Sequence, residues 1–206
     1  MASTLRCWVW VAGVVLTGAL GAPSQAAGDA QRGKQIGYTC LGCHGIENYK
    51  NVYPTYSVPK LVGQHPDYLI AALKSYRGKE RSHGTMFAQA SSLSDQDMQD
   101  LAAYLSELPL AAGAAVVGTP PAKVTALCAA CHGANGVGIT KDYPTLAGQH
   151  ADYLARALVE YQKGDRKNAI MQSFVVQLSA ADIKAIADFY AAQRPELRTV
   201  LRRNWR

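Results

Sequence analysis

The sequence reads CLGCH at residues 40–44 and CAACH at residues 128–132, and this repeated pattern decides the fold. Each copy places two thiols within one helical turn, a spacing that suits a zinc site, a redox disulfide or two thioether bonds to a haem. The histidine that directly follows each second cysteine favours the haem, because C-x-x-C-H is the attachment signature of haem c. Once the porphyrin is anchored, His44 and His132 can reach the iron from one side.

The first twenty-six residues differ in composition from the rest of the chain. Arg6 precedes an apolar run from Trp8 to Leu20, and small residues follow it up to Ala26 and Ala27. This order is typical of a secretory signal peptide that is cleaved after one of these two alanines. The run is shorter than the roughly 20 residues that span a bilayer. The sequence therefore predicts a signal peptide over residues 1–26 and export to the periplasm.

The cysteines support the haem interpretation by their number and position. Cleavage would remove Cys7 and leave four cysteines, all of them in the two motifs. An exported chain could pair them as disulfides. A zinc site would need a fourth ligand that the sequence does not indicate, and a thioredoxin-like disulfide would need a βαβ pattern. Two matched motifs instead predict two haem c groups, attached through Cys40, Cys43, Cys128 and Cys131.

The two motifs belong to a longer internal duplication. PKLVGQHPDYLIAALKSY at 59–76 aligns with PTLAGQHADYLARALVEY at 144–161 at an offset of 85, whereas the C-x-x-C-H motifs are 88 apart. The first unit therefore carries three additional residues between its motif and the aligned stretch. An uncharged segment rich in Ala, Gly and Pro at 111–121 is typical of a linker. We expect one domain at 27–110 and a second at 122–206.

Both units have the composition and periodicity of helical globular domains. Apolar residues make up 49% of the chain, which excludes a disordered or fibrous protein. Apolar and aromatic residues recur at helical spacing in 68–76 and again in 153–161. Ser94 and Ser179 each precede an aspartate by three residues, which indicates the start of a final helix. The sequence predicts an all-α fold of two tandem helical domains, each around one covalently bound haem.

Two methionines are candidates for the second axial position of each iron. Met86 and Met171 correspond in the repeat, and each lies about forty residues after its histidine. We expect both in loops, GTMFAQ and AIMQSF, from which a thioether could reach the haem face opposite the histidine. Met98 aligns with Ile183 and is expected in the core. Axial ligation by histidine and methionine raises the reduction potential, which suits an electron carrier.

This order of features resembles a known family. C-x-x-C-H, then P-x-L-x-G, a helix and a methionine is the order of a class I cytochrome c domain, and P-x-L-x-G occurs here at 59–63 and 144–148. The tandem arrangement with its GQHxxYL elements resembles the dihaem cytochrome c4 family. The resemblance implies that the carbonyls of Pro59 and Pro144 accept hydrogen bonds from the axial histidines. It also implies a periplasmic electron carrier whose two haems face each other across the domain interface and which supplies a terminal oxidase.

The remaining polar residues allow more than one interpretation. His65 and His150 lie just before a helix, and capping or hydrogen bonding near the haem edge is expected of them. Most of the net charge of +6 comes from residues 194–206. This segment could be a solvated helix end, or it could contact anionic lipid or an acidic partner. Smaller basic groups precede each methionine; we expect them near helix C-termini, although they could steer a partner or neutralise haem propionates. They are Arg77, Lys79, Arg81, Lys163, Arg166 and Lys167.

Two irons with both axial positions filled offer no place for a substrate, so we expect an electron-transfer protein and not an enzyme. The expected partners are an oxidase and an upstream quinol-oxidising complex or dehydrogenase, with peripheral membrane association as an option and no nucleic acid. The alternative is a dihaem subunit of a dehydrogenase, such as flavocytochrome c sulfide dehydrogenase, which would co-purify with a flavoprotein. A dihaem peroxidase would need an open iron face, which the matched methionines oppose.

Overall fold

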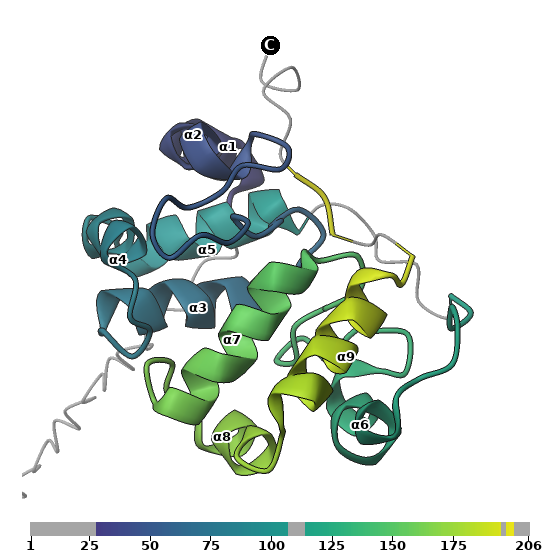
Figure 1. Ribbon diagram of the computed structural model, residues 1–206. Helices are drawn as coiled ribbons and strands as arrows, with labels where there is room; N and C mark the ends of the chain where they lie inside the picture. Colours follow the sequence, from purple (N-terminus) through teal and green to yellow (C-terminus); the bar gives the residue numbers. More distant parts are fainter. Residues whose placement is uncertain (1–27, 107–113, 195–196, 200–206) are drawn as a thin grey trace, which may run out of the picture.

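The computed structural model describes residues 28–106, 114–194 and 197–199, and Figure 1 shows them as two groups of helices. The predicted signal peptide, the first part of the predicted linker and most of the C-terminal tail lie outside the described residues. Within the described ranges the chain is helical, and extended backbone pairs only in isolated bridges. The predicted all-α fold is confirmed. No single helix in these ranges is long and apolar enough to cross a membrane; α8 (Ala169–Val175) and α9 (Ala180–Ala191) qualify only as a pair bent by 116°.

The first half begins and ends with helices that pack together. Its helices are α1 (Ala30–Ile36), the 3-10 helix η1 (Gly37–Cys40), α2 (Leu41–His44), α3 (Pro66–Arg77), α4 (Gly84–Ser91) and α5 (Asp95–Leu105). Asp29 caps α1, and its N–H donates to the buried Asp100 carboxylate of α5 at 2.8 Å. Arg32 pairs with the same carboxylate. Gly33 permits this close packing, because a Cβ there would lie 1.9 Å from the Asp100 carbonyl oxygen.

The second half repeats this order but approaches its C-x-x-C-H motif differently. Its helices are η2 (Val124–Cys128), α6 (Ala129–His132), α7 (Ala151–Lys163), α8 and α9. One turn of π-helix, η2, takes the place that α1 and η1 have in the first half. Val124 in this turn is fully buried in an apolar cluster that joins α7, α8 and α9. The corresponding cluster of the first half is smaller and centres on Leu41, Leu69 and Ala102.

The last helix of each half starts where the sequence predicts it. Ser94 and Ser179 form reciprocal capping boxes with the aspartates three residues further on, at the N-termini of α5 and α9. Such boxes satisfy backbone N–H groups that the first turn of a helix leaves unpaired. The aligned pair Met98 and Ile183 is buried, as expected of core residues. The duplication therefore preserves both the start and the inner face of this helix.

The two halves meet beside α3 and α7, which lie next to each other at the centre of Figure 1. Asp152 on α7 accepts hydrogen bonds from the N–H and the hydroxyl of Ser57 at 3.0 and 2.9 Å. Beyond α9, Leu197 is buried, and Arg198 exchanges backbone hydrogen bonds of 2.9 and 3.1 Å with Val62 of the first half. The described part of the basic tail is thus extended backbone bound across the interface, and not a helix end.

Candidate haem sites

Each histidine of the C-x-x-C-H motifs is buried and held in one orientation. His44 Nδ1 lies 2.8 Å from the Pro59 carbonyl oxygen, and His132 Nδ1 lies 2.9 Å from that of Pro144. A carbonyl can only accept, so each Nδ1 carries the proton and each Nε2 keeps its lone pair. Burial lowers the pKa of both rings, which keeps the imidazoles neutral. A neutral ring with a free Nε2 is the form that binds a metal.

The first motif borders an apolar pocket. Cys40 and His44 line it together with Leu61, Leu101 and Leu105. The aliphatic lining suits a flat apolar macrocycle, and the cysteine at its side suits covalent attachment. The first-half residues therefore fit a haem by the chemistry of their lining and of their donor atoms.

The structure pairs none of the four motif cysteines in a disulfide. Burial raises the pKa of Cys40 and raises that of Cys128 to about 11, so these two side chains lie in an apolar environment. No group of three or more His, Cys, Asp and Glu side chains arranged for a metal ion occurs within the ranges that the structure describes. The zinc alternative gains no support from the observed geometry.

The prediction that the two methionines lie in loops is wrong. Met86 is the third residue of α4, and Met171 is the third residue of α8. The reason is local capping: His83 Nδ1 accepts from the Met86 N–H at 3.2 Å, and Asn168 Oδ1 accepts from the Met171 N–H at 3.0 Å. Each cap starts a short helix and fixes the backbone of its methionine. The two methionines keep equivalent positions in the halves, as the repeat indicates.

Two arginines form a buried cationic pair between the halves. Arg81 is 9% exposed and Arg166 is 4% exposed, and their backbones pair as an isolated bridge. Among the described residues, neither guanidinium has a carboxylate within ion-pair distance, and Nε of Arg166 has no hydrogen-bond partner. The Tyr68 hydroxyl accepts from Arg166 at 2.8 Å. Burial raises the pKa of Tyr68, but the two arginines outweigh it and lower the pKa to about 8. The two buried, incompletely satisfied cations fit carboxylates that the described residues do not supply, such as haem propionates.

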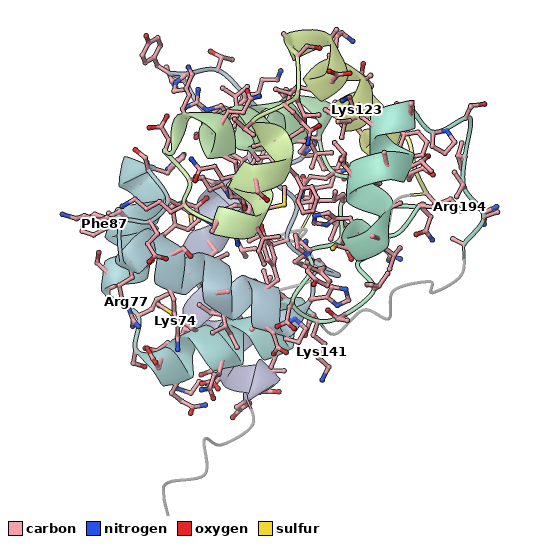
Figure 2. The ribbon with its side chains drawn as sticks, turned by 90° about the horizontal axis from the view of Figure 1, so that it is seen from below. Lys74, Arg77, Phe87, Lys123, Lys141 and Arg194 are labelled. Atoms are coloured by element: carbon pink, nitrogen blue, oxygen red, sulfur yellow. The ribbon has the colours of Figure 1, made fainter. Side chains whose placement is uncertain are left out.

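Other basic residues of the first half stay at the surface. Lys74 and Arg77 lie near the end of α3 and both pair with Asp95, Lys74 at 2.9 Å. Figure 2 shows the two side chains close together at the edge of the molecule. Lys79 Nζ lies 4.8 Å from the centre of the Phe87 ring. Arg77 has the expected placement near a helix C-terminus. Arg81 and Arg166 also lie there, because their N–H groups donate to the Ser75 and Glu160 carbonyls in the last turns of α3 and α7, but their burial was not expected.

The repeated GQH segments hold residues whose roles sequence reasoning missed or misjudged. His65 and His150 occupy the cap positions of α3 and α7, but neither side chain caps its helix. His65 Nε2 instead lies 3.2 Å from the Gly138 carbonyl oxygen of the other half. The neighbouring Gln64 and Gln149 are buried and bind across the interface, a function that sequence reasoning did not assign. Their repetition at a fixed offset was the signal that could have indicated it.

Comparison with known proteins identifies the family of both halves. The cytochrome c family model matches residues 30–109 and again 120–191. Cytochrome c4 of Pseudomonas aeruginosa is 34% identical over 192 residues, which cover 85% of this chain and 94% of that protein. The crystal structure of reduced cytochrome c4 from Pseudomonas stutzeri is 30% identical, covers 82% of this chain and 100% of that one, and has a TM-score of 0.64. The thiosulfate dehydrogenase electron acceptor of Stutzerimonas stutzeri is 30% identical over 74% of this chain and 77% of that protein.

The fold and the two matched motifs define a c-type cytochrome with two domains. Two haem c groups are bound covalently, one at Cys40 and Cys43 and the other at Cys128 and Cys131. Within this class, the chain belongs to the dihaem cytochrome c4 family. It is an electron-transfer cytochrome, a kind of protein that is not catalytic in itself.

Proposed function

We propose that the chain carries electrons in the periplasm to a terminal oxidase, with His44 and Met86 as axial ligands of one iron and His132 and Met171 of the other. One observation carries the proposal: in both halves the Nδ1–H of a buried histidine donates a hydrogen bond to a proline carbonyl, which leaves the lone pair of Nε2 free for a metal. The bound haem supplies a one-electron couple.

The residues of the chain do the rest by holding the ligands and excluding water. Pro59 and Pro144 fix the tautomer and the orientation of the histidines, as partners of ligating histidines generally do. The capped starts of α4 and α8 fix Met86 and Met171. Ligands held in this way need little rearrangement when the charge on the iron changes, which favours electron transfer.

Arg81 and Arg166 are the residues proposed to bind the haem propionates. They lie between the two halves, they are buried, and they lack carboxylate partners among the described residues. A buried cation is stable only when it is paired, so a resident anion is expected beside them. Propionates from both haems would meet this need and would bring the two cofactors to the same interface.

Location and domain limits form part of the same proposal. The signal-like segment at 1–26 supports export, and the domain limits at 27–110 and 122–206 follow from the repeat with a linker at 111–121. The arginine-rich end of the chain would add contact with an acidic partner or with anionic lipid. An upstream quinol-oxidising complex or a dehydrogenase would supply the electrons.

A second candidate function is electron acceptor to a dehydrogenase. Relatives named thiosulfate dehydrogenase electron acceptor support it, because they match about three quarters of the chain. Co-purification distinguishes the two functions: a tagged full chain that brings down a dehydrogenase in stoichiometric amount would favour the second. Rapid oxidation of the reduced chain by oxidase-containing membranes, without such a partner, would favour the first.

The axial ligands are tested on the purified holoprotein by redox titration with visible spectra. Ferric haem with methionine ligation has a charge-transfer band at the red end of the visible spectrum, and both haems are expected to contribute to it. Met86→His and Met171→His should each remove about half of this band and lower one of two midpoint potentials, since imidazole donates more strongly than a thioether.

The control for this titration is Met98→Leu, which conserves volume in the buried core of α5. It should leave the full intensity of the band and both midpoint potentials unchanged. A wild-type protein with no such band would overturn the methionine assignment, and a chain without covalently attached porphyrin would overturn the function as a whole.

A further inference from the structure

Two buried glutamines join the halves in a symmetrical way. Gln64 Nε2 donates to the Thr145 carbonyl at 3.0 Å, and Gln64 Oε1 accepts from the Thr145 N–H at 2.8 Å. Gln149 makes the same two bonds with Lys60, both at 3.0 Å. Each glutamine is 5% exposed. We call these four hydrogen bonds the crossed glutamine brace.

The brace ends on the peptide groups that hold the two histidines. The Lys60 N–H and the Pro59 carbonyl belong to one planar peptide unit. Gln149 binds the N–H side of this unit, and His44 Nδ1 binds the carbonyl side at 2.8 Å. A continuous hydrogen-bonded path therefore runs from a glutamine of the second half to the histidine of the first. The reverse path consists of Gln64, Thr145, Pro144 and His132.

The surrounding backbone keeps both glutamines in place. Gly63 and Gly148 precede them with φ values of 89° and 72°, a left-handed conformation that glycine adopts without strain. The Gly63 N–H donates to the Leu105 carbonyl at 2.8 Å, and the Gly148 N–H donates to the Tyr190 carbonyl at 3.1 Å. Each glutamine Oε1 also accepts from the N–H of the following residue. The brace is therefore a fixed part of the interface in both directions.

We propose that Gln64 and Gln149 are positioning residues through which each half sets the ligand strength of the histidine in the other half. Accepting a hydrogen bond from a peptide N–H polarises the peptide and makes its carbonyl a stronger acceptor. A stronger acceptor at Nδ1 makes the imidazole a better donor to the iron, and this favours the oxidised state. The inference rests on the proposed ligation by His44 and His132.

The test measures the two midpoint potentials and the paramagnetic NMR signals of the holoprotein in single variants. Met86→His and Met171→His first assign each signal to one half. Gln64→Leu should then raise the potential and shift the ligand signals of the haem in the second half, and Gln149→Leu should do the same in the first. In each variant the haem of the same half should change least.

Two further variants guard the interpretation. His65→Ala removes a neighbouring contact across the interface, the one between His65 and the Gly138 carbonyl. Gly138 is not adjacent to Pro144, so this variant should not shift the potential of the haem in the second half. Where Gln64→Leu does not fold, Gln64→Glu keeps the acceptor for the Thr145 N–H and loses the donor to its carbonyl. A carboxylate is a stronger acceptor than an amide, so this variant should lower the potential of the haem in the second half instead of raising it.

The outcomes separate the brace from the ligation on which it rests. The proposed role of the brace is overturned if a glutamine variant shifts both potentials equally, shifts only the potential of the half that carries the substitution, or shifts neither. This holds provided that Met86→His and Met171→His, the two marker variants, each change one haem as expected. If the marker variants change nothing in either half, the axial assignment has failed instead, whatever the glutamine variants show.

Discussion

The two GQH segments have stayed alike, whereas the segments that lead into the two C-x-x-C-H motifs have diverged. Gln64 and Gln149 make the same bonds in opposite directions, and the histidine–proline distances differ by 0.1 Å between the halves. The lead-in segments share little: α1 and η1 precede one motif, and a single π-helical turn precedes the other. The glutamine bonds across the interface have therefore stayed symmetrical, whereas the segments that lead into the two motifs have changed.

The lead-in segments are also stabilised by different forces. In the first half, the Asp100 carboxylate, 1% exposed, receives the Asp29 N–H and pairs with Arg32. The equivalent of Asp100 in the second half is Ala185, and there the buried Val124 packs η2 onto the apolar cluster instead. The polar contacts to Asp100 require the backbones of α1 and α5 to approach closely. The packing of Val124 depends instead on the volume of its side chain in the apolar cluster. Substitutions that affect only one of these should therefore destabilise only one half.

The largest difference in stability between the two halves is expected from Gly33→Ala. The new Cβ would meet the carbonyl oxygen of Asp100 at 1.9 Å, and this backbone atom cannot move aside without separating α1 from α5. The substitution should lower the free energy of unfolding by about 1–3 kcal/mol, the usual cost of overpacking. Hydrogen exchange with mass spectrometry should show faster exchange in α1 and α5 and unchanged exchange in α7 and α9.

Gln31→Ala is the control on the same helix, because Gln31 is exposed and the change should stay within about 0.5 kcal/mol. Uniform loss of protection in both halves would show that the halves unfold as one unit, and the contrast between a polar and an apolar lead-in segment would then have no energetic meaning.

An intermediate effect is expected at the caps of the methionine helices. His83→Ala and Asn168→Ala each remove the acceptor of a methionine N–H, and each should cost about 1 kcal/mol. His83→Asn copies the cap of the second half and should restore most of the stability. The measurement is the urea concentration at which the methionine-to-iron band of each haem disappears; an alanine variant indistinguishable from wild type would contradict the role of these caps.

The smallest effect concerns pH and the contact between Asp152 and Ser57. Burial raises the pKa of Asp152, but hydrogen bonds from Ser57 and Lys50 outweigh it and hold the pKa below its usual value. The contribution to stability is therefore complete above the unfolded pKa of about 3.9 and is lost as the pH falls through the lower folded value. Because the pair is partly exposed, it is worth at most about 1 kcal/mol.

Thermal unfolding between neutral and acidic pH checks this contribution. Asp152→Asn should flatten part of the acid dependence of the melting temperature. Asp67 is the equivalent residue of the first half and is exposed, so Asp67→Asn should retain the wild-type curve. If both variants respond alike, the interface contact has no part in the acid dependence.

Local signals in the sequence were sufficient where both halves use the same helix cap. Ser94 and Ser179 start helices because their hydroxyls reach the N–H three residues ahead, and such a cap can be recognised from spacing alone. The methionine helices escaped prediction because their caps, a histidine in one half and an asparagine in the other, do not form a shared pattern. The buried arginines escaped it because burial between domains leaves no trace in the charge of a segment.

The sequence by itself determined two duplicated helical units, two covalent haem sites and the histidine next to each second cysteine, since these follow from spacing within a few residues. Only the tertiary structure decided that Gln64 and Gln149 act on the opposite half and that Arg81 and Arg166 are buried together. The reason is physical: a hydrogen bond between residues more than eighty positions apart depends on how two surfaces fit, which a pattern within one unit does not encode.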